Sequence, residues 1–288
     1  MKAAVVVTGA SRSFGRCLAL DFARELRVDA HALDLYLWAR DERELHETAR
    51  LAQVAWSDKS GSGELRTIVQ AVDLGDKSDY VPKIDALIAQ LVAGSYDRLF
   101  LVHNAGSLGE LGFTNEWSSQ EILSQYWEFN LTSVCWLNKR FLDAFGASRD
   151  ELLAADAAAL VESPTPARSV IVNITSLCGI KPFETYSLYC TGKAAREMHH
   201  QVIAAEQAVS DKVRVLSYSP GPMDTGMQQV FRESPMVHPK LAKNYITMKA
   251  EGTLVPPEKS SRRGVLLTLS GAFETGAHVD YYELEHLG

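Results

Sequence analysis

The chain has 288 residues, a length that suits one large α/β domain or two small ones. Hydrophobic residues make up 46% of the chain and charged residues 23%, which supplies a sizeable core and excludes intrinsic disorder as the main state. Lys and Arg number 29 against 36 Asp and Glu, so the formal net charge is −7, and we expect no nucleic acid partner.

Three further observations bear on the expected location. No apolar stretch approaches the roughly 18 residues needed to cross a bilayer, so no membrane span is expected. The start of the chain runs straight into a glycine loop, and we interpret it as a first strand rather than a signal peptide. The cysteines form no CxxC pair, which predicts a reduced, cytoplasmic protein without a disulfide or zinc framework. They are Cys17, Cys135, Cys178 and Cys190.

Short runs rich in Val, Ile and Leu alternate with longer stretches of helical spacing. The expected strands are 3–8, 33–39, 66–72, 98–103, 169–174, 213–218 and 277–280, and the expected helices include 15–26, 42–54, 77–92 and 118–145. Apolar strands separated by helices predict an α/β fold with a doubly wound parallel sheet, Rossmann-like, of about seven strands with helices on both faces. We expect a single domain over 1–288, with ligands beyond the carboxyl ends of the strands.

Three segments interrupt this rhythm. Residues 57–63 predict a flexible loop, and residues 146–168, with an alanine run and two prolines, predict an insertion. Residues 223–257 contain four prolines and are interpreted as a mobile substrate cover, with a solvated surface excursion as the alternative.

The loop after the first expected strand reads Thr-Gly-Ala-Ser-Arg-Ser-Phe-Gly-Arg over residues 8–16. Glycines let the chain turn sharply and let backbone N–H groups approach a pyrophosphate at the start of a helix. We therefore predict a dinucleotide-binding loop, with a plain strand–helix turn as the alternative. The residues expected to contact the cofactor here are Gly9, Ser11, Arg12, Ser13, Phe14 and Gly15.

Arg40 follows the second expected strand, close to Arg12 of the glycine loop in the predicted fold. A carboxylate at this strand end accepts hydrogen bonds from a ribose 2′-hydroxyl, whereas a guanidinium suits a 2′-phosphate. Asp41 is also expected to form a capping box with Glu44 at the start of the next helix. The two arginines favour NADP(H); the alternative is that they only decorate the surface.

Other strand ends supply further candidate contacts. Asp73 and Leu74 are expected to hold the adenine edge, and the small turn after His103 is expected to let the cofactor ribose pass. His103 itself is interpreted as a buried, hydrogen-bonded residue without a catalytic role. The remaining expected cofactor contacts are Asn104, Ala105, Gly106, Pro220, Gly221, Met223, Asp224, Thr225, Met227 and Gln228.

Tyr189 and Lys193 are four residues apart, so they share one face of a predicted helix. The ammonium is expected to lower the phenol pKa from about 10 toward neutrality, which suits proton transfer to a developing alkoxide. The same spacing recurs at Tyr245 and Lys249. Only Tyr189 has a serine, Ser176, thirteen residues earlier and just past an expected strand, so we interpret the second pair as a chance match.

Ser176 is expected to donate a hydrogen bond to a carbonyl oxygen, with a turn cap as the alternative. Asn130 is expected to kink its helix or to hold a water near Lys193, with a solvated helical asparagine as the alternative. No Gly-x-Ser-x-Gly motif is present, and His199 and His200 lack ligand partners, so no metal site is expected.

These motifs resemble the short-chain dehydrogenase/reductase family over nearly the whole chain, and within it the sepiapterin reductases. The matching segments are 8–16, 103–109, 126–133, 173–178, 188–196, 219–229 and 276–281. The last of these is not a general family motif and weighs most for the subfamily. The chain departs from the family pattern at Ser13, where a glycine is usual, and at His103, where an asparagine is usual.

The resemblance implies a role for each matching residue. Tyr189 is the expected acid, Lys193 lowers its pKa and binds the nicotinamide ribose, Ser176 polarises the carbonyl, and Asn130 completes a proton relay. Asp280 is expected to anchor the amino-pyrimidine of a pterin. The expected substrate contacts are Ser176, Leu177, Tyr189, Gly221 and Asp280.

The resemblance also implies an NADPH-dependent homodimer that reduces side-chain carbonyls of 6-acyl pterins, namely sepiapterin and 6-pyruvoyl-tetrahydropterin, in the final step of tetrahydrobiopterin synthesis. One alternative is a short-chain reductase of diketones or other small carbonyls that does not act on pterins. The other is a catalytically idle dinucleotide sensor.

Overall fold

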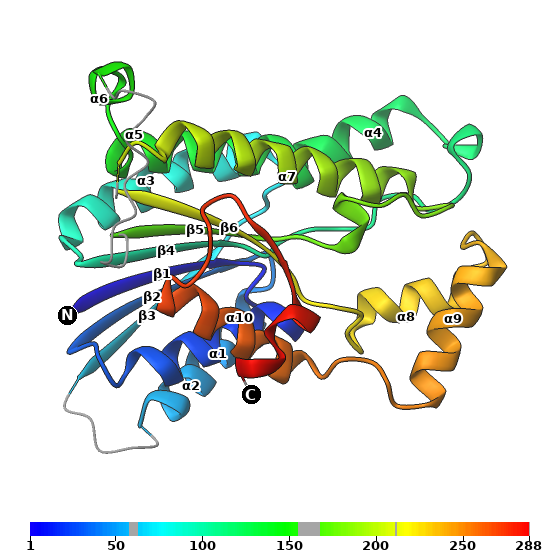
Figure 1. The fold of residues 1–288 in the computed structure, drawn as a ribbon, viewed down its shortest axis with the longest axis horizontal. Coiled ribbons are helices and arrows are strands. Elements are labelled where there is room, and N and C mark those ends of the chain that lie inside the picture. Colours follow the sequence, from blue (N-terminus) through cyan, green and yellow to red (C-terminus); the bar gives the residue numbers. More distant parts are fainter. Residues whose placement is uncertain (58–62, 155–167, 211, 288) are drawn as a thin grey trace.

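The computed structural model describes residues 1–57, 63–154, 168–210 and 212–287. Seven strands form one parallel sheet in the order β3-β2-β1-β4-β5-β6-β7 (Figure 1). The strands are β1 (Lys2–Thr8), β2 (Ala32–Ala39), β3 (Glu64–Ala71), β4 (Arg98–His103), β5 (Ser169–Ile174), β6 (Val213–Ser219) and β7 (His278–Asp280). The predicted doubly wound, Rossmann-like sheet is confirmed, and the strand ends lie within two residues of those expected.

Helices cover both faces of this sheet (Figure 1). One layer holds α1 (Ser13–Leu26), α2 (Glu42–Ser57) and α10 (Pro257–Ser270). The other holds α3 (Lys77–Gly94), α5 (Ser133–Phe145) and α7 (Ser187–Gln207), with α4 (Gln120–Trp127) ahead of α5. The remaining elements are α6 (Arg149–Ala154), α8 (Gly226–Glu233), α9 (Pro239–Ala250) and the 3₁₀ turns η1 (Thr114–Glu116), η3 (Leu177–Gly179) and η4 (Tyr281–Leu287).

Strand β1, which lies inside the sheet between β2 and β4, shows why the sequence pattern predicts this arrangement. Val5 and Val7 pack into the layer of α1, whereas Ala4 and Val6 pack into the layer of α3, and all four are almost completely buried. Each valine side chain removed from water contributes about 2 kcal/mol. A strand buried on both faces therefore reads as a continuous apolar run, without the polar alternation of a half-exposed strand.

The single helix expected over 118–145 is wrong. The chain forms α4, then a π-helical turn, η2 (Glu128–Thr132), and then α5. Asn130 lies in the π turn, and its Nδ2 donates to the carbonyl oxygen of Tyr126 at 3.0 Å. A side-chain amide that satisfies a backbone carbonyl competes with the regular helical hydrogen bond, which accounts for the π turn at Asn130. The kink expected from Asn130 stays a prediction.

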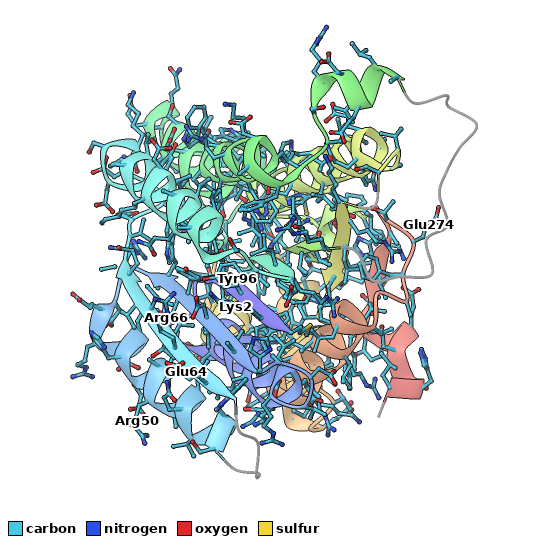
Figure 2. All side chains as sticks on the ribbon, turned by 90° about the vertical axis from the view of Figure 1, so that its left-hand side faces the viewer. Lys2, Arg50, Glu64, Arg66, Tyr96 and Glu274 are labelled. Carbon is cyan, nitrogen blue, oxygen red and sulfur yellow. The ribbon has the colours of Figure 1, made fainter. Side chains whose placement is uncertain are left out.

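A cluster of polar side chains fastens the edge strand β3 to the rest of the sheet. Arg66 of β3 donates to both carboxylate oxygens of Asp34 on β2, at 2.9 and 2.6 Å. Tyr96 donates to the same carboxylate, and its ring lies 5.0 Å from the Lys2 ammonium. Figure 2 shows Lys2, Arg66 and Tyr96 gathered along one side of the molecule.

Of the three segments that interrupt the alternation of strands and helices, the structure describes only parts of 57–63 and 146–168 and all of 223–257. Residues 58–62 and 155–167, which make up most of the expected loop and insertion, lie outside the described residues. Residues 223–257 form α8 and α9, which extend beyond the carboxyl ends of the strands (Figure 1). Met223 and Val255 pair as an isolated bridge, so this excursion leaves and rejoins the fold at one place. Its role as a cover stays a prediction. In the described part of the chain, no helix is long and apolar enough to span a membrane.

Candidate active site

A cleft of about 990 Å³ opens at the carboxyl ends of the strands. Its volume is at the upper end of the range usual for small-molecule sites. Its wall brings together most of the predicted cofactor residues. These are Gly9, Ser11, Arg12, Ser13, Phe14, Gly15, Arg40, Asp41, Leu74, Asn104, Ala105, Gly106, Tyr189, Lys193, Pro220, Met223, Thr225 and Met227.

The glycine loop is shaped for close backbone approach. Gly9 has a φ of +70°, and Ser13 has a φ of 51°, in the left-handed region that costs a non-glycine residue about 1 kcal/mol. A Cβ on Gly15 would lie 2.1 Å from the carbonyl oxygen of Gly9, so only glycine fits there. Asn104 Nδ2 donates to the carbonyl oxygens of Thr8 and Gly9 at 3.0 and 3.2 Å, which ties the turn after β4 to this loop.

The start of α1 suits an anion. Its first turn carries no acidic side chain, and the N-cap residue Arg12 makes no side-chain capping hydrogen bond. The backbone N–H groups of this first turn therefore face the cleft without a partner from the cap, at the positive end of the helix dipole.

Arg12 and Arg40 are exposed in the cleft wall, and neither forms an ion pair with any carboxylate in the described residues. Asp41 Oδ1 accepts a hydrogen bond from the Glu44 backbone N–H at 3.1 Å, which confirms one half of the predicted capping box. The Glu44 carboxylate binds Arg16 at 2.8 Å, so its charge is balanced inside the protein.

The residues predicted to transfer a proton meet where β5 ends against α7. Tyr189 and Lys193 are each only 8% exposed, and the Lys193 Nζ lies 5.7 Å from the centre of the Tyr189 ring. Lys193 Nζ donates to the carbonyl oxygen of Ile174 at 2.7 Å. Ser176, two residues after β5, accepts a hydrogen bond from the Cys178 backbone N–H at 3.2 Å, so it also serves as the turn cap considered as its alternative role.

Burial dominates the electrostatics of this group and corrects one expectation. Burial raises the pKa of Tyr189, and a hydrogen bond with the Ser176 side chain offsets this only in part. Burial, followed by the nearby Arg196 guanidinium, holds the pKa of Lys193 well below its usual value. The pKa of Tyr189 in the protein alone thus shifts in the direction opposite to that expected, because the cost of burying a phenolate exceeds the help from its neighbours.

Asn130 is buried at 4% exposure, so the alternative of a solvated asparagine is wrong. Its Oδ1 accepts from the Ser107 backbone N–H at 2.8 Å, and its Nδ2 donates to Ser107 Oγ at 3.0 Å. A Cβ on Gly106 would lie 3.6 Å from this Oδ1 and 3.9 Å from Lys193 Nζ. Asn130 and Lys193 therefore converge on the same small turn.

Several predicted residues lie outside the cleft wall. These are Asp73, Gly221, Asp224, Gln228, Ser176, Leu177, Asn130 and Asp280. Asp73 Oδ1 accepts from the Gly75 backbone N–H at 2.9 Å and shapes the turn after β3, whose neighbours Val72 and Leu74 line the cleft instead. Asp224 pairs with Lys249, which commits the lysine of the second Tyr–Lys motif to a carboxylate.

The expected substrate contacts border the cleft. Asp280 ends β7 beside Ser219 of β6, the residue before Pro220 in the cleft wall. Its Oδ2 accepts from Ser219 Oγ at 2.7 Å, and its Oδ1 accepts from the Tyr282 backbone N–H at 3.1 Å. Leu177 is 38% exposed, directly after Ser176, so an apolar side chain is open to a ligand there.

Sequence reasoning missed part of the wall. The additional lining residues are Trp38, Ala39, Glu44, Val72, Phe129, Ile174, Thr175 and Gly226. Ala39, Val72 and Thr175 directly adjoin a predicted residue at a strand end, so their position was the available signal. Phe129 reaches the cleft from the π turn, directly before the predicted residue Asn130.

Comparison with known proteins settles the family. A family model described as short chain dehydrogenase matches residues 3–235. The chain belongs to the short-chain dehydrogenase/reductase family. It is therefore an oxidoreductase of a family whose members bind nicotinamide cofactors.

Among curated relatives of this short-chain dehydrogenase/reductase, the sepiapterin reductase of Meriones unguiculatus is 39% identical over 98% of this chain and 97% of that protein. The benzil reductase ((S)-benzoin forming) of Bacillus subtilis (strain 168) is 24% identical over 92% of this chain and 91% of its own length. Of solved structures, the KRED1-Pglu enzyme has a TM-score of 0.73 at 24% identity and covers 97% of this chain and 100% of that one. This structural likeness shows the shared fold.

Proposed function

We propose that the protein is an NADPH-dependent carbonyl reductase that acts on 6-acyl pterins, sepiapterin and 6-pyruvoyl-tetrahydropterin, in the final step of tetrahydrobiopterin synthesis. The observation that carries this proposal is a cleft whose wall holds Tyr189 and Lys193 together with a glycine loop and two unpaired arginines. Ser176 borders this cleft and is hydrogen-bonded to Tyr189. The 39% identity to a sepiapterin reductase over nearly the full chain supports the substrate.

The cleft fits a dinucleotide. The missing side chain of Gly15 lets the start of α1 pack against the Gly9 carbonyl and Asn104, and the uncapped first turn of α1 offers N–H donors to a pyrophosphate. Arg12 and Arg40 would hold the 2′-phosphate that distinguishes NADPH from NADH. A bound reduced nicotinamide would supply the hydride for the carbonyl carbon.

The protein supplies the proton and the geometry. Ser176 donates a hydrogen bond to the carbonyl oxygen and holds it near the Tyr189 hydroxyl. The raised pKa of Tyr189 keeps the phenol protonated at neutral pH, so it is ready to give its proton as the oxygen becomes an alkoxide. The Lys193 side chain, held by the Ile174 carbonyl, then faces the phenolate that remains.

Asp280 is the proposed pterin anchor. Each of its carboxylate oxygens accepts one hydrogen bond within the protein and retains acceptor capacity for the amino-pyrimidine edge. Leu177 and Gly221 would contact the pterin ring. We also propose a cytoplasmic location, which the free thiols of Cys17, Cys135, Cys178 and Cys190 support.

The test of the proton donor is Tyr189→Phe. Wild-type protein should oxidise NADPH in the presence of sepiapterin, and the loss of nicotinamide absorbance measures this rate. The kcat of the variant should be lower by about 10²-fold or more, because general acid catalysis is removed. Tyr245→Phe is the matched control, since Tyr245 has the same spacing to a lysine but lies on α9 against Phe231. Turnover by Tyr189→Phe within threefold of wild type would refute the assignment.

The diketone alternative is tested with Asp280→Ala. The variant should lower kcat/KM for sepiapterin about tenfold or more, since a charge-assisted hydrogen bond to the pterin contributes roughly 1.5–3 kcal/mol. Reduction of a small diketone such as benzil should stay within twofold. Wild-type protein that reduces benzil and leaves sepiapterin untouched would establish the alternative instead, and either turnover would exclude an idle sensor.

A further inference from the structure

Arg196 of α7 is a buried cation that the proposed chemistry does not use. Its side chain is 1% exposed, and in the described part of the chain it forms no ion pair. Its Nη1 donates to the carbonyl oxygen of Ala105 at 2.9 Å, its Nη2 to that of His103 at 2.7 Å, and its Nε to Asn173 Oδ1 at 3.0 Å. Burying a guanidinium without a counter-ion is costly, and an apolar side chain would stabilise the core more simply.

A chain of hydrogen bonds returns from this arginine to itself. His200 Nδ1 lies 2.7 Å from the Arg196 carbonyl oxygen, which can only accept, so this nitrogen carries the proton. Burial holds the pKa of His200 well below its usual value, so the ring is neutral and its Nε2 accepts from Asn138 Nδ2 at 3.2 Å. Asn138 Oδ1 then accepts from His103 Nε2 at 2.7 Å, and the His103 carbonyl accepts from Arg196.

The closed ring joins three elements beneath the cleft. His103 ends β4, Asn138 lies on α5, and His200 and Arg196 lie on α7, all of them at most 1% exposed. A Cβ on Gly106 would lie 3.8 Å from Arg196 Nη1 and 3.9 Å from Lys193 Nζ, so the arginine and the lysine flank the same turn.

We propose that His103, Asn138, Arg196 and His200 are positioning residues, which hold the turn 104–106 at a fixed distance from Lys193. The inference rests on the proposed function, because this turn and Lys193 would border the nicotinamide end of the cofactor. It also accounts for the departure at His103, since an asparagine side chain is too short to replace an imidazole as the partner of Asn138.

The ring of hydrogen bonds can be tested without an activity measurement, through the protonation of its two histidines. In ¹⁵N NMR spectra of the free protein at neutral pH, His200 should carry its proton on Nδ1 and His103 on Nε2. The opposite tautomer at either histidine would overturn the ring, because the hydrogen-bond directions would no longer close on Arg196.

The kinetic test is Asn138→Leu, which keeps the size of the side chain and removes both of its hydrogen bonds. We expect the KM for NADPH to rise about fivefold or more and kcat with sepiapterin to fall about tenfold, since small displacements of positioned groups have large effects on rate. Arg196→Lys should be impaired in the same way, because an ammonium keeps the charge but does not span the three acceptors.

The matched control is Thr268→Val on α10, which removes a buried hydrogen bond to the Gly264 carbonyl at 2.7 Å on the opposite face of the sheet. It should lower Tm with both kinetic parameters within twofold of wild type. The same pattern in Asn138→Leu, a lower Tm with unchanged KM and kcat, would show a merely structural role. If wild-type protein does not reduce sepiapterin, the proposed substrate fails, and the Kd for NADPH from nicotinamide fluorescence still tests the ring.

Discussion

Arg12 and Arg40 are the two residues on which the proposed preference for NADPH rests. Both were predicted from their place after β1 and β2, and both line the cleft without an ion-pair partner in the described residues. A guanidinium paired with a carboxylate would gain less from a phosphate, because it would first have to give up that partner. The unpaired state therefore favours a phosphate ligand over a neutral hydroxyl.

The double variant Arg12→Gln, Arg40→Gln should have a KM for NADPH about tenfold higher or more, since two charge-assisted hydrogen bonds to the 2′-phosphate are removed. The KM for NADH should change less than threefold. Arg50→Gln is the control, because Arg50 pairs with Glu47 on the exposed side of α2. Equal effects on the two cofactors would contradict the assignment.

At the residue scale, the sequence predicted which residues line the cleft better than it predicted their electrostatics. Gly9, Gly15 and Lys193 were placed correctly because their chemistry is local to a strand end or to one helical turn. The direction of the Tyr189 pKa shift was wrong, because burial by distant parts of the chain decides it. The commitment of Asp224 to Lys249, 25 positions away, had no signal in the spacing of motifs.

At the element scale, apolar periodicity predicted the strands and most helices, and it missed what one side chain does to a helix. The stretch 118–145 has continuous helical spacing, but the amide of Asn130 takes the Tyr126 carbonyl and the chain forms the π turn η2. The pattern of apolar residues records which face is buried. It does not record the exchange of a backbone hydrogen bond for a side-chain one.

A buried pair between α7 and β7 supplies a pH-dependent part of the stability. Glu197 Oε1 lies 3.2 Å from His278 Nδ1, with side chains 5% and 13% exposed. Glu197 raises the pKa of His278 above 6.5, and hydrogen bonding with His278 helps to hold the pKa of Glu197 below 4.5 despite its burial. Charged His278 contributes its full stabilisation below pH 6.5, and this contribution is lost as the pH rises through the raised pKa of His278 in the folded protein. Ionised Glu197 contributes its full stabilisation above pH 4.5, and this contribution is lost as the pH falls through the lowered pKa of Glu197 in the folded protein.

His278→Gln should therefore lower the free energy of unfolding by about 1–3 kcal/mol near pH 5.5 and by less near pH 9, because only the charged pair is worth this much. Urea denaturation at the two pH values measures the difference. His46→Gln is the control, since His46 and Glu42 are 3.9 Å apart and two-thirds exposed. A loss that is the same at both pH values would show that the pair is not ionised.

At the scale of the whole molecule, α5 and α7 leave an apolar face uncovered. Trp136 of α5 is 36% exposed, and Met198 and Val202 of α7 are 59% and 46% exposed. We propose that two copies pair through these helices as the homodimer that the family resemblance implies. Apolar side chains gathered on neighbouring helices are typical of interfaces between identical subunits.

Sedimentation should give a mass near twice the 31.7 kDa of one chain, and the double variant Met198→Glu, Val202→Glu should give a single-chain mass, because two carboxylates in the contact repel those of the partner. Met236→Glu is the control, since Met236 is 44% exposed beyond α8, away from this face. A wild-type protein that sediments as one chain would remove the homodimer from the proposal.

The short bridge between Met223 and Val255 separates two parts of the protein that can change at different rates. Because the helices α8 and α9 depart from and return to neighbouring points, insertions or exchanges within them alter the enclosed length without displacing either attachment, and a longer loop adds little entropic cost. A descendant of this protein could thus vary α9 and the turns around it while Met223, Thr225 and Met227 keep their places in the cleft wall.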